Sequence, residues 1–343
     1  MPHSQHNIST TDLAVIGAGP AGLFTIFEAG MLKMHCHVID ALDFIGGQCA
    51  ALYPEKPIFD IPAHPHIEAQ ELIDKLEEQA TPFKPVYHLG QQVTGFKKED
   101  DGHFLLTTSK HVQLRAKAII IAAGCGAFGP NRPPLEGLEA YEGKSVFYMV
   151  RRKKDFEGKN VVIAGGGDSA VDWALELEGI AKKIYIVHRR PKFRCAPESQ
   201  SRLEQLSQAG KIELVVPYQL DALKGDNGML STVVVKTLDG ETRELEADVL
   251  LPFFGLAMEL GPIAAWELAL EHKHLKVDPA TMQTNIPGIF AIGDIASYPG
   301  KLKLILNGFA EAAMACHASR AVAYPDQAFH FEYSTTSGVP VEA

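Results

Sequence analysis

Two glycine-rich segments carry the residue types that could bind a phosphate. The first runs Gly17-Ala18-Gly19-Pro20-Ala21-Gly22, a GxGxxG, and the second runs Gly165-Gly166-Gly167-Asp168-Ser169-Ala170, a GxGxxA. In such a segment the first glycine makes a tight turn, the second lets the backbone approach a pyrophosphate, and the third position allows close packing of helix on strand. A helix that begins there offers N–H groups and a partial positive charge to the phosphate. Both segments therefore predict dinucleotide binding; the competing interpretation is a glycine turn without a ligand.

The two segments differ 23 residues after their first glycine. The first has Asp40 at this position, and an acid there hydrogen-bonds the ribose hydroxyls of adenosine. The second has His188, followed by three arginines at Arg189, Arg190 and Arg194. Replacing the acid by guanidinium groups favours a ribose 2′-phosphate over a free hydroxyl. We therefore expect the first segment to bind FAD and the second NADPH, with a solvated basic loop as the alternative for the arginines.

The elements around both segments are those that such a site needs. A β-type run over 12–16 precedes the first glycines, a helical stretch follows them, and a second strand covers 35–40. The same order of strand, glycine turn, helix and strand returns over 160–188, 148 residues later. This repeat of a whole unit predicts an α/β protein with two Rossmann-like nucleotide-binding domains.

Other stretches have recognisable patterns. We predict an amphipathic helix over 66–80, strands within 86–121 and 212–251, a buried strand over 116–124, a second buried strand over 288–294 that ends on an aspartate, and a helix of small residues over 307–323. The predicted FAD domain is discontinuous, with parts 1–127 and 257–343. The NADP domain, 128–256, is inserted between them.

Composition and charge disfavour several other classes of function. The 343 residues are 46% hydrophobic, which suffices for about two packed domains, and the net charge of −10 disfavours nucleic-acid binding. No apolar run approaches the roughly 20 residues of a membrane helix, and the first ten residues lack the pattern of a signal peptide. The five cysteines show no CxxC spacing, so we expect neither a metal site nor a disulfide scaffold, and a cytoplasmic location.

The chain resembles the two-dinucleotide-binding flavoprotein reductases, whose short members are the thioredoxin reductases. Within them it is most similar to the bacterial, thioredoxin-reductase-like ferredoxin–NADP reductases. The resemblance covers about 12–337, and its specific segments are IGGQCAALYPEKPIFDIPA (45–63), AAGCGAFGP (122–130), HRRPKFR (188–194), GDIASYPGKLKLILNGFAEA (293–312) and EYSTTS (332–337).

The resemblance implies roles for single residues. Asp40 would hold the adenosine ribose, Val93 would meet the adenine through its backbone, and Tyr53 would lie on the flavin beside Gln48. Phe128 and Asp294 would line the FAD site, although Asp294 could instead cap a helix. Thr335 and Tyr333 would reach the flavin from the C-terminal tail, which in this family can come from the partner subunit of a homodimer.

The resemblance also has an informative departure. Thioredoxin reductases carry a CxxC about a dozen residues before the second glycine motif, where this chain has Tyr148-Met149-Val150-Arg151. Dithiol exchange is excluded at that position. Electrons must then pass directly from the flavin to an acceptor protein, for which the resemblance implies ferredoxin or flavodoxin. We name no catalytic acid or base, because hydride transfer between nicotinamide and flavin needs ring placement rather than a nucleophile.

A basic run, Arg151-Arg152-Lys153-Lys154, could dock an acidic ferredoxin on this otherwise acidic protein, with help from Lys301 and Lys303. The alternative is a solvated loop. Two other functions also stay open: a thioredoxin-reductase-like NADPH-dependent flavoprotein with another acceptor, and a non-catalytic flavoprotein that senses NADPH.

Overall fold

The computed structural model describes residues 8–327 and Gly338. The chain divides into two compact units. One comprises the residues up to Phe128 and from Met258 onward, and the other comprises Gly129–Ala257. Where the chain passes between the units, strand β9 (Ala127–Pro130) pairs with strand β17 (Leu256–Glu259).

The first unit is built on a sheet of seven strands in the order β5-β2-β1-β8-β7-β6, with β20 also paired to β8. β1, β2, β5, β8 and β20 are mutually parallel, whereas β7 runs antiparallel to both of its neighbours, β8 and β6. The strands of this sheet are β1 (Ser9–Ile16), β2 (Cys36–Ile39), β5 (Val86–His88), β6 (Val93–Lys98), β7 (Phe104–Thr108), β8 (Gln113–Ile121) and β20 (Ile289–Ala291).

Strand β8 joins the two kinds of pairing. Its first half pairs with β7, and its last residues, Ile119 to Ile121, pair with β20. These three isoleucines are fully buried, as expected for a strand covered on both faces. Their carboxyl end leads directly into the segment that faces the first glycine turn.

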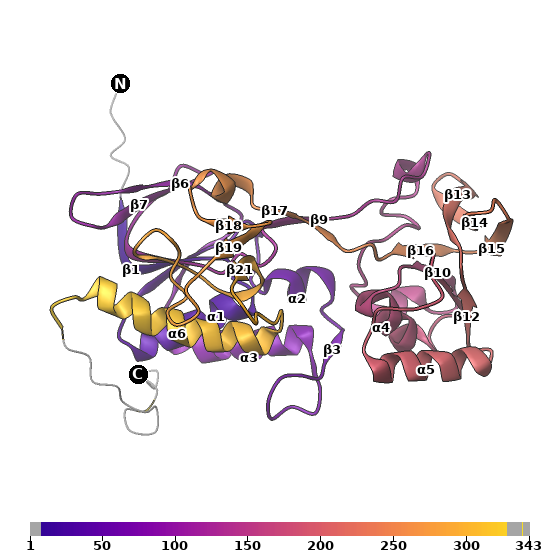
Figure 1. The fold of residues 1–343 in the computed structure, drawn as a ribbon, viewed down its shortest axis with the longest axis horizontal. Helices are drawn as coiled ribbons and strands as arrows, with labels where there is room; N and C mark the ends of the chain where they lie inside the picture. Colours follow the sequence, from indigo (N-terminus) through magenta and orange to yellow (C-terminus); the bar gives the residue numbers. More distant parts are fainter. Residues whose placement is uncertain (1–7, 328–337, 339–343) are drawn as a thin grey trace. The chain divides into compact units, whose positions relative to one another are not determined.

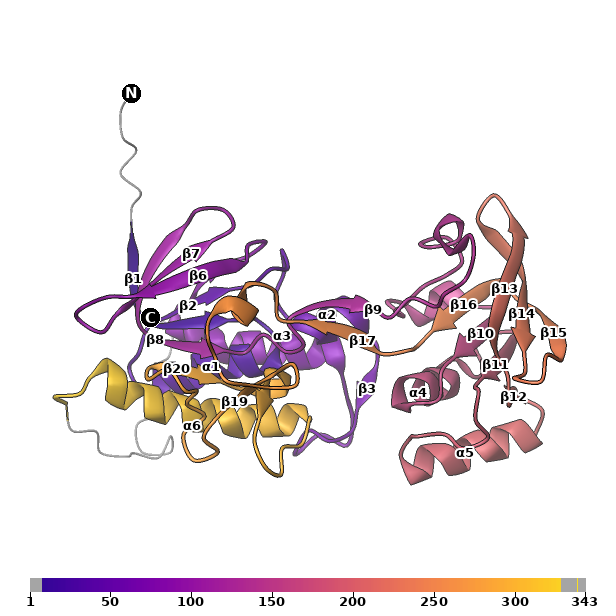
Figure 2. The same cartoon turned by 45° about the horizontal axis from the view of Figure 1, so that its top comes forward.

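Three helices cover one face of this sheet: α1 (Pro20–Met31), α3 (Ala69–Ala80) and α6 (Ile305–Ala323). Figures 1 and 2 show them together on the same side of the strands. The unit also contains the short helix α2 (Gly47–Leu52). Five short strands complete it: β3 (Pro57–Ile58), β4 (Ile67–Glu68), β18 (Leu270–Glu271), β19 (His274–Lys276) and β21 (Ala296–Ser297).

The second unit repeats the nucleotide-binding arrangement. Its parallel sheet has the order β12-β11-β10-β16. The residues between β12 and β16 form a separate antiparallel sheet, β13-β14-β15. The elements are β10 (Asn160–Ala164), α4 (Asp168–Leu177), β11 (Lys183–Val187), α5 (Pro197–Gln208), β12 (Ile212–Val215), β13 (Gln219–Asp226), β14 (Met229–Lys236), β15 (Thr242–Glu246) and β16 (Val249–Pro252). The α/β class predicted from the sequence is therefore confirmed.

Some predicted boundaries were wrong. The helix predicted over 66–80 begins at Ala69, because Ile67 and Glu68 form β4 and pair with β3. The strand predicted over 116–124 ends at Ile121, and Gly124 has a φ of +56°, a conformation outside the β region. Helix α6 begins two residues before the predicted Asn307.

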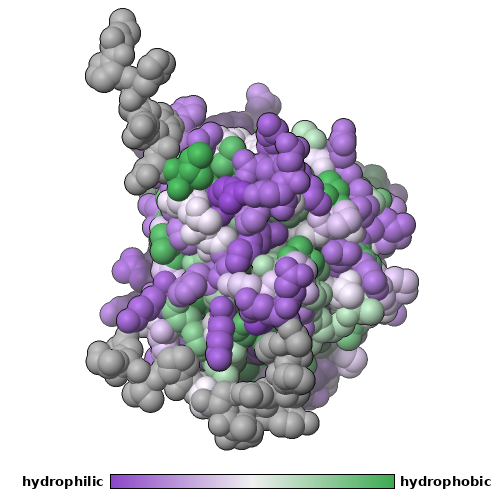
Figure 3. Space-filling model, turned by 90° about the vertical axis from the view of Figure 1, so that its left-hand side faces the viewer, coloured by the Kyte–Doolittle hydropathy of each residue, from purple (hydrophilic) through white to green (hydrophobic). Residues whose placement is uncertain are grey.

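No helix among the described residues has the length and apolar character to cross a membrane. The face of the molecule seen in Figure 3 is largely hydrophilic, with apolar side chains in small groups between polar ones.

Candidate functional site

The first glycine motif forms the turn from β1 into α1. Gly17 has a φ of +112°, and a Cβ there would lie 2.3 Å from the carbonyl oxygen of Ala122. A Cβ on Gly22 would lie 2.0 Å from the carbonyl oxygen of Gly17, so the helix can approach the turn only with glycine at this position. Among the described residues, only Gly47 comes within 4 Å of a Cβ built on Gly19, at 3.9 Å, so the backbone there is accessible to a ligand. No side chain among the described residues caps α1, and the N–H groups that follow Pro20 in its first turn stay available for an anion.

Asp40 follows β2 and faces this turn. Its Oδ2 accepts the N–H of Ala18 at 2.6 Å, and its Oδ1 accepts the N–H of Leu42 at 2.8 Å. Burial raises the pKa of Asp40 above its ordinary value, and the two N–H groups partly offset this shift. The carboxylate is thus held beside the glycine turn, where an acid can accept hydrogen bonds from a ribose.

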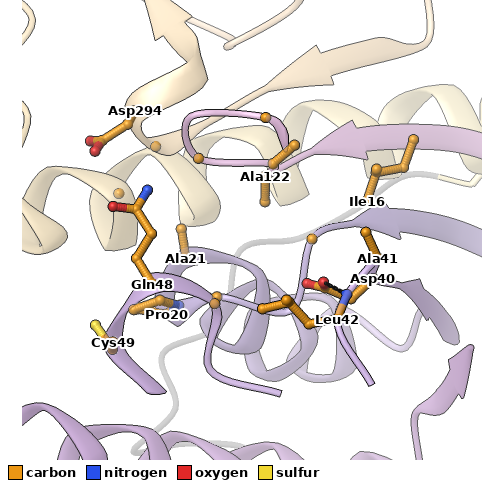
Figure 4. Close-up of a pocket in the computed structure, with 18 of the residues that line it drawn as sticks. Ile16, Pro20, Ala21, Asp40, Ala41, Leu42, Gln48, Cys49, Ala122 and Asp294 are labelled. Carbon is orange, nitrogen blue, oxygen red and sulfur yellow. Dashed lines mark hydrogen bonds between the residues drawn. The ribbon is translucent and has the colours of Figure 1, made fainter. Parts of the chain in front are cut away.

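A cavity of about 420 Å³ runs along the glycine turn. Figure 4 shows Asp40 and Leu42 at one end, and Gln48, Cys49 and Asp294 at the other. Gly17 and Gly19 of the first motif line the stretch between them. The cavity is within the range typical of small-molecule sites. Its two ends, separated by the glycine turn, have the layout that a dinucleotide requires.

The far end of the cavity is formed by α2 and by the turn after β20. Gln48 and Cys49 lie on α2, Tyr53 ends that helix, and all three line the cavity with Asp294. Cys49 donates a hydrogen bond from Sγ to the Tyr53 hydroxyl at 3.8 Å. Burial raises the pKa of the Cys49 thiol to about 11 and also raises that of Cys125, so both remain protonated thiols at neutral pH.

The remaining predicted FAD residues divide into two groups. Val93 begins β6, is 2% exposed and lines the cavity near its Asp40 end. The backbone of Phe128 lies in β9, but its side chain is outside the part that the structure describes. Tyr333 and Thr335 also lie outside the described residues.

The second glycine motif forms the turn from β10 into α4. Gly165 has a φ of +154°, and a Cβ there would lie 2.6 Å from the carbonyl oxygen of Phe253. A Cβ on Gly167 would come no closer to the described residues than 3.9 Å, from the carbonyl oxygen of Arg194, so a ligand can approach the backbone there. Asp168 and Ser169 are exposed in the first turn of α4, and Asp168 accepts the N–H of Ala196 at 3.1 Å.

His188 directly follows β11 and lies against this turn. A Cβ on Gly166 would meet the His188 ring at 2.3 Å, and the ring stacks at a tilt on Phe193 with centroids 5.4 Å apart. Burial, followed by the charges of the neighbouring arginines, lowers the pKa of His188. The neutral imidazole therefore supports the turn.

The arginines themselves remain on the surface. Arg189, Arg190 and Arg194 are all exposed, and the N–H of Arg194 donates to the carbonyl of Gly166 at 2.7 Å. The structure thus brings the predicted arginines to the edge of the second glycine turn, where a phosphate on the ribose can be met by guanidinium groups.

The position of the absent dithiol is occupied by a polar cluster. Tyr148 donates from its hydroxyl to Glu142 at 2.6 Å, and Arg132 donates to both oxygens of the same carboxylate, at 2.8 and 2.6 Å. The five cysteines of the chain are all free thiols.

Two residues at the cavity of the first unit were not predicted from the sequence. Gln91 lines the cavity and is 8% exposed, and Glu311 is 2% exposed and accepts the N–H of Gly293 at 2.7 Å. The only signal for Glu311 was a single carboxylate in a helix of small residues, and Gln91 had none because it precedes a strand in a polar loop.

Comparison with known proteins identifies this arrangement. The family profile described as pyridine nucleotide-disulphide oxidoreductase matches residues 11–315. A ferredoxin–NADP reductase of Paramagnetospirillum magneticum is 61% identical over 330 residues, which cover 96% of this chain and 98% of the relative. A ferredoxin–NADP reductase of Granulibacter bethesdensis is 62% identical over 338 residues, which cover 98% and 96%.

Solved structures show the same fold. The thioredoxin reductase of Lactococcus lactis is 26% identical with a TM-score of 0.80, and the match covers 92% of this chain and 99% of that one. The thioredoxin reductase of T. acidophilum is 23% identical with a TM-score of 0.79, over 91% and 98%. The chain therefore belongs to the pyridine nucleotide-disulphide oxidoreductase family, in the branch of the thioredoxin-reductase-like ferredoxin–NADP reductases.

Proposed function

We propose that this chain is an FAD-dependent oxidoreductase that transfers electrons between NADP(H) and ferredoxin or flavodoxin. The first unit is the FAD domain, discontinuous over 1–127 and 257–343, and the inserted residues 128–256 are the NADP domain. The observation that carries the proposal is the contrast between two similar glycine turns. One faces the carboxylate of Asp40, and the other lies beside Arg189, Arg190 and Arg194.

The residues of the first unit fit FAD. Gly19 leaves its backbone accessible, α1 begins there without a side-chain cap, and Asp40 stands at the adenosine end. Val93 would lie beside the adenine, and Phe128 would complete the wall. Gln48, Tyr53 and Asp294 would hold the flavin end, with Tyr53 against the ring. Thr335 and Tyr333 would cover the ring from the tail.

The residues of the second unit fit NADP(H). Gly165 and Gly167 would admit the pyrophosphate, and Asp168 and Ser169 would present the first N–H groups of α4 to it. Arg189, Arg190 and Arg194 would bind the 2′-phosphate, while neutral His188 keeps Gly166 in place.

The chain's part in the chemistry is placement. Bound FAD supplies an acceptor for hydride and returns electrons one at a time. Cys49 and Tyr53 keep their protons at neutral pH, because burial raises both pKa values. Among the described residues that line this end of the cavity, Asp294 and Lys303 are the charged ones. No proton transfer from a side chain is needed to bring the rings together.

The acceptor would dock at the basic run 151–154. Arg152 forms an ion pair with Asp155 at 2.9 Å, and Lys153 with Glu176 at 2.7 Å, so Arg151 and Lys154 are left as the principal docking charges. Lys301 takes no part, contrary to expectation, because its side chain is 7% exposed and pairs with Glu311. Lys303 is exposed and hydrogen-bonds His274 at 2.8 Å.

The assembly and location are proposals of the same kind. We expect a homodimer, which sedimentation equilibrium would test, and a cytoplasmic location. Five free thiols suit a reducing compartment.

Two anaerobic measurements test the function. NADPH should bleach the flavin absorbance, and NADH should do so far more slowly. The reduced protein should then reduce cytochrome c only when ferredoxin or flavodoxin is added. Absence of bleaching would favour the NADPH sensor, and bleaching with no transfer to either carrier would favour a reductase with another acceptor.

A further inference from the structure

The side chain of Gln91 lies at the adenosine end of the cavity. It is 8% exposed and is among the residues that line the cavity. Its backbone N–H donates to the carbonyl of Asp40 at 3.0 Å. Gln91 is therefore fixed beside the backbone of Asp40, the residue whose carboxylate is proposed to bind the ribose, and two residues before Val93.

A chain of hydrogen bonds determines which way the carboxamide of Gln91 faces. Thr108 Oγ1 accepts the N–H of Val112 at 3.2 Å and donates its own proton to Gln91 Oε1 at 2.6 Å. Thr108 is 2% exposed, so water does not compete for these bonds. With Oε1 committed to the hydroxyl, the two donors of the carboxamide are on its other side.

The amide NH₂ of Gln91 has no acceptor among the residues that the structure describes. Because Gln91 lines the cavity, an acceptor on a bound ligand can pair with this donor. Adenosine offers ring nitrogens and ribose oxygens as acceptors. A carboxamide held by a second side chain is preorganised for such a bond.

We propose that the NH₂ of Gln91 donates a hydrogen bond to the adenosine half of FAD, and that Thr108 orients it for this purpose. The inference rests on the proposed binding of FAD by the first unit. It makes Gln91 a binding residue for the cofactor, beside Asp40 and Val93, and Thr108 a positioning residue.

The experiment measures FAD, ADP and FMN binding to the flavin-free full chain by titration calorimetry, with ADP as the probe of the adenosine end. Gln91→Met keeps the size of the side chain and removes both donors. It should weaken FAD and ADP about tenfold each and leave FMN unchanged. Thr108→Val should weaken ADP by a smaller factor, and Thr108→Ser should restore it, because serine keeps the hydroxyl. The thermal midpoint of each flavin-free variant is recorded alongside.

Wild-type ADP affinity in Gln91→Met would overturn the proposal, and so would equal losses of ADP and FMN. If Gln91→Met does not fold, the Thr108→Val and Thr108→Ser pair decides: equal ADP affinities in the two overturn the orienting role and with it the proposal. Failure of the wild type to bind ADP would also overturn it. A wild type that binds FAD and ADP but passes no electrons to ferredoxin or flavodoxin would refute the proposed function alone.

Discussion

The Oε2 atom of Glu311 accepts a hydrogen bond from the backbone N–H of Gly293 at 2.7 Å, and this bond connects the middle of α6 to the turn that carries Asp294. Gly293 has a φ of +71°, in the left-handed region. The other oxygen of Glu311 is hydrogen-bonded by the Tyr298 hydroxyl at 2.7 Å and forms an ion pair with Lys301. One buried carboxylate thus holds two walls of the cavity together.

The first prediction concerns this ion pair. Glu311→Gln keeps an acceptor for Gly293 but leaves the ammonium of Lys301 buried without an opposite charge. Such a loss destabilises a protein by about 3–5 kcal/mol. The free energy of unfolding, measured by urea denaturation of the flavin-free chain, should fall by that amount, and FAD affinity should fall with it because the turn before Asp294 loosens.

Two controls define this effect. The double variant Glu311→Gln/Lys301→Met should recover much of the lost stability, since no unpaired charge remains. Glu71→Gln removes the exposed pair of Glu71 with Lys75 and should change stability by no more than about 0.5 kcal/mol. Equal losses in Glu311→Gln and Glu71→Gln would contradict the role given to burial.

The second prediction concerns the pH dependence at Asp40. Its pKa is raised by burial, so the carboxylate takes up a proton at a higher pH than an ordinary aspartate. The ribose hydroxyls bind best to the ionised form, because hydrogen bonds to a charged acceptor are stronger. FAD affinity should therefore fall as the pH drops from neutral toward this raised pKa.

The stability of the flavin-free chain should respond with the opposite sign. A carboxyl whose pKa is raised by folding contributes stability that is fully present below its unfolded-state pKa and is lost as the pH rises through its folded-state pKa. Asp40→Asn should remove both dependences and weaken FAD binding about 10- to 100-fold, since asparagine has no charge and only one of the two acceptor oxygens of Asp40. Fluorescence titrations with FAD across the acid range measure this, and an unchanged pH profile in Asp40→Asn would refute the assignment.

The local sequence was enough to predict the glycine turns and their partners. The roles expected of Gly17 and Gly22 depend only on sterics within one strand–turn–helix unit, and the structure places a carbonyl oxygen within 2.3 Å of where each Cβ would lie. The contrast between Asp40 and His188 was also visible, because both lie at a fixed distance from their glycines along the chain.

Contacts between distant segments could not be predicted in this way. Gln91 depends on Thr108, which is brought to it by the pairing of β6 with β7, and Glu311 depends on a turn 18 residues earlier. Lys301 looked like a surface charge, but the fold buries it against α6. Neither periodicity nor residue type reports which polar side chain the tertiary structure will enclose.

The third prediction concerns the choice of nicotinamide cofactor. Arg189→Ala/Arg190→Ala should weaken NADP⁺ binding at least about tenfold, because hydrogen bonds to the 2′-phosphate are charge-assisted. NAD⁺ binding should not change, since that dinucleotide lacks the phosphate. Calorimetric titrations with both dinucleotides test this, with the exposed Arg202→Ala on α5 as the control. A double variant that weakens NADP⁺ and NAD⁺ equally would argue for a general loss of structure in the second unit.

The last prediction concerns docking of the acceptor protein. Arg151 and Lys154 are exposed and stand in a run whose other two charges form ion pairs with Asp155 and Glu176. Arg151→Glu/Lys154→Glu should raise KM for ferredoxin several-fold and make it less sensitive to salt, because a local attraction to an acidic partner becomes a repulsion. KM for ferricyanide, a small acceptor that needs no protein docking surface, should change far less.

A matched variant separates local docking from the net charge of the chain. Lys182→Glu/Arg202→Glu makes the same change in charge at two other exposed positions of the second unit. It should leave KM for ferredoxin near the wild-type value at physiological ionic strength, where charges more than about 8 Å apart are largely screened. If both double variants raise KM for ferredoxin alike, the run 151–154 is a solvated loop, and the acceptor is attracted only by the overall field of the protein.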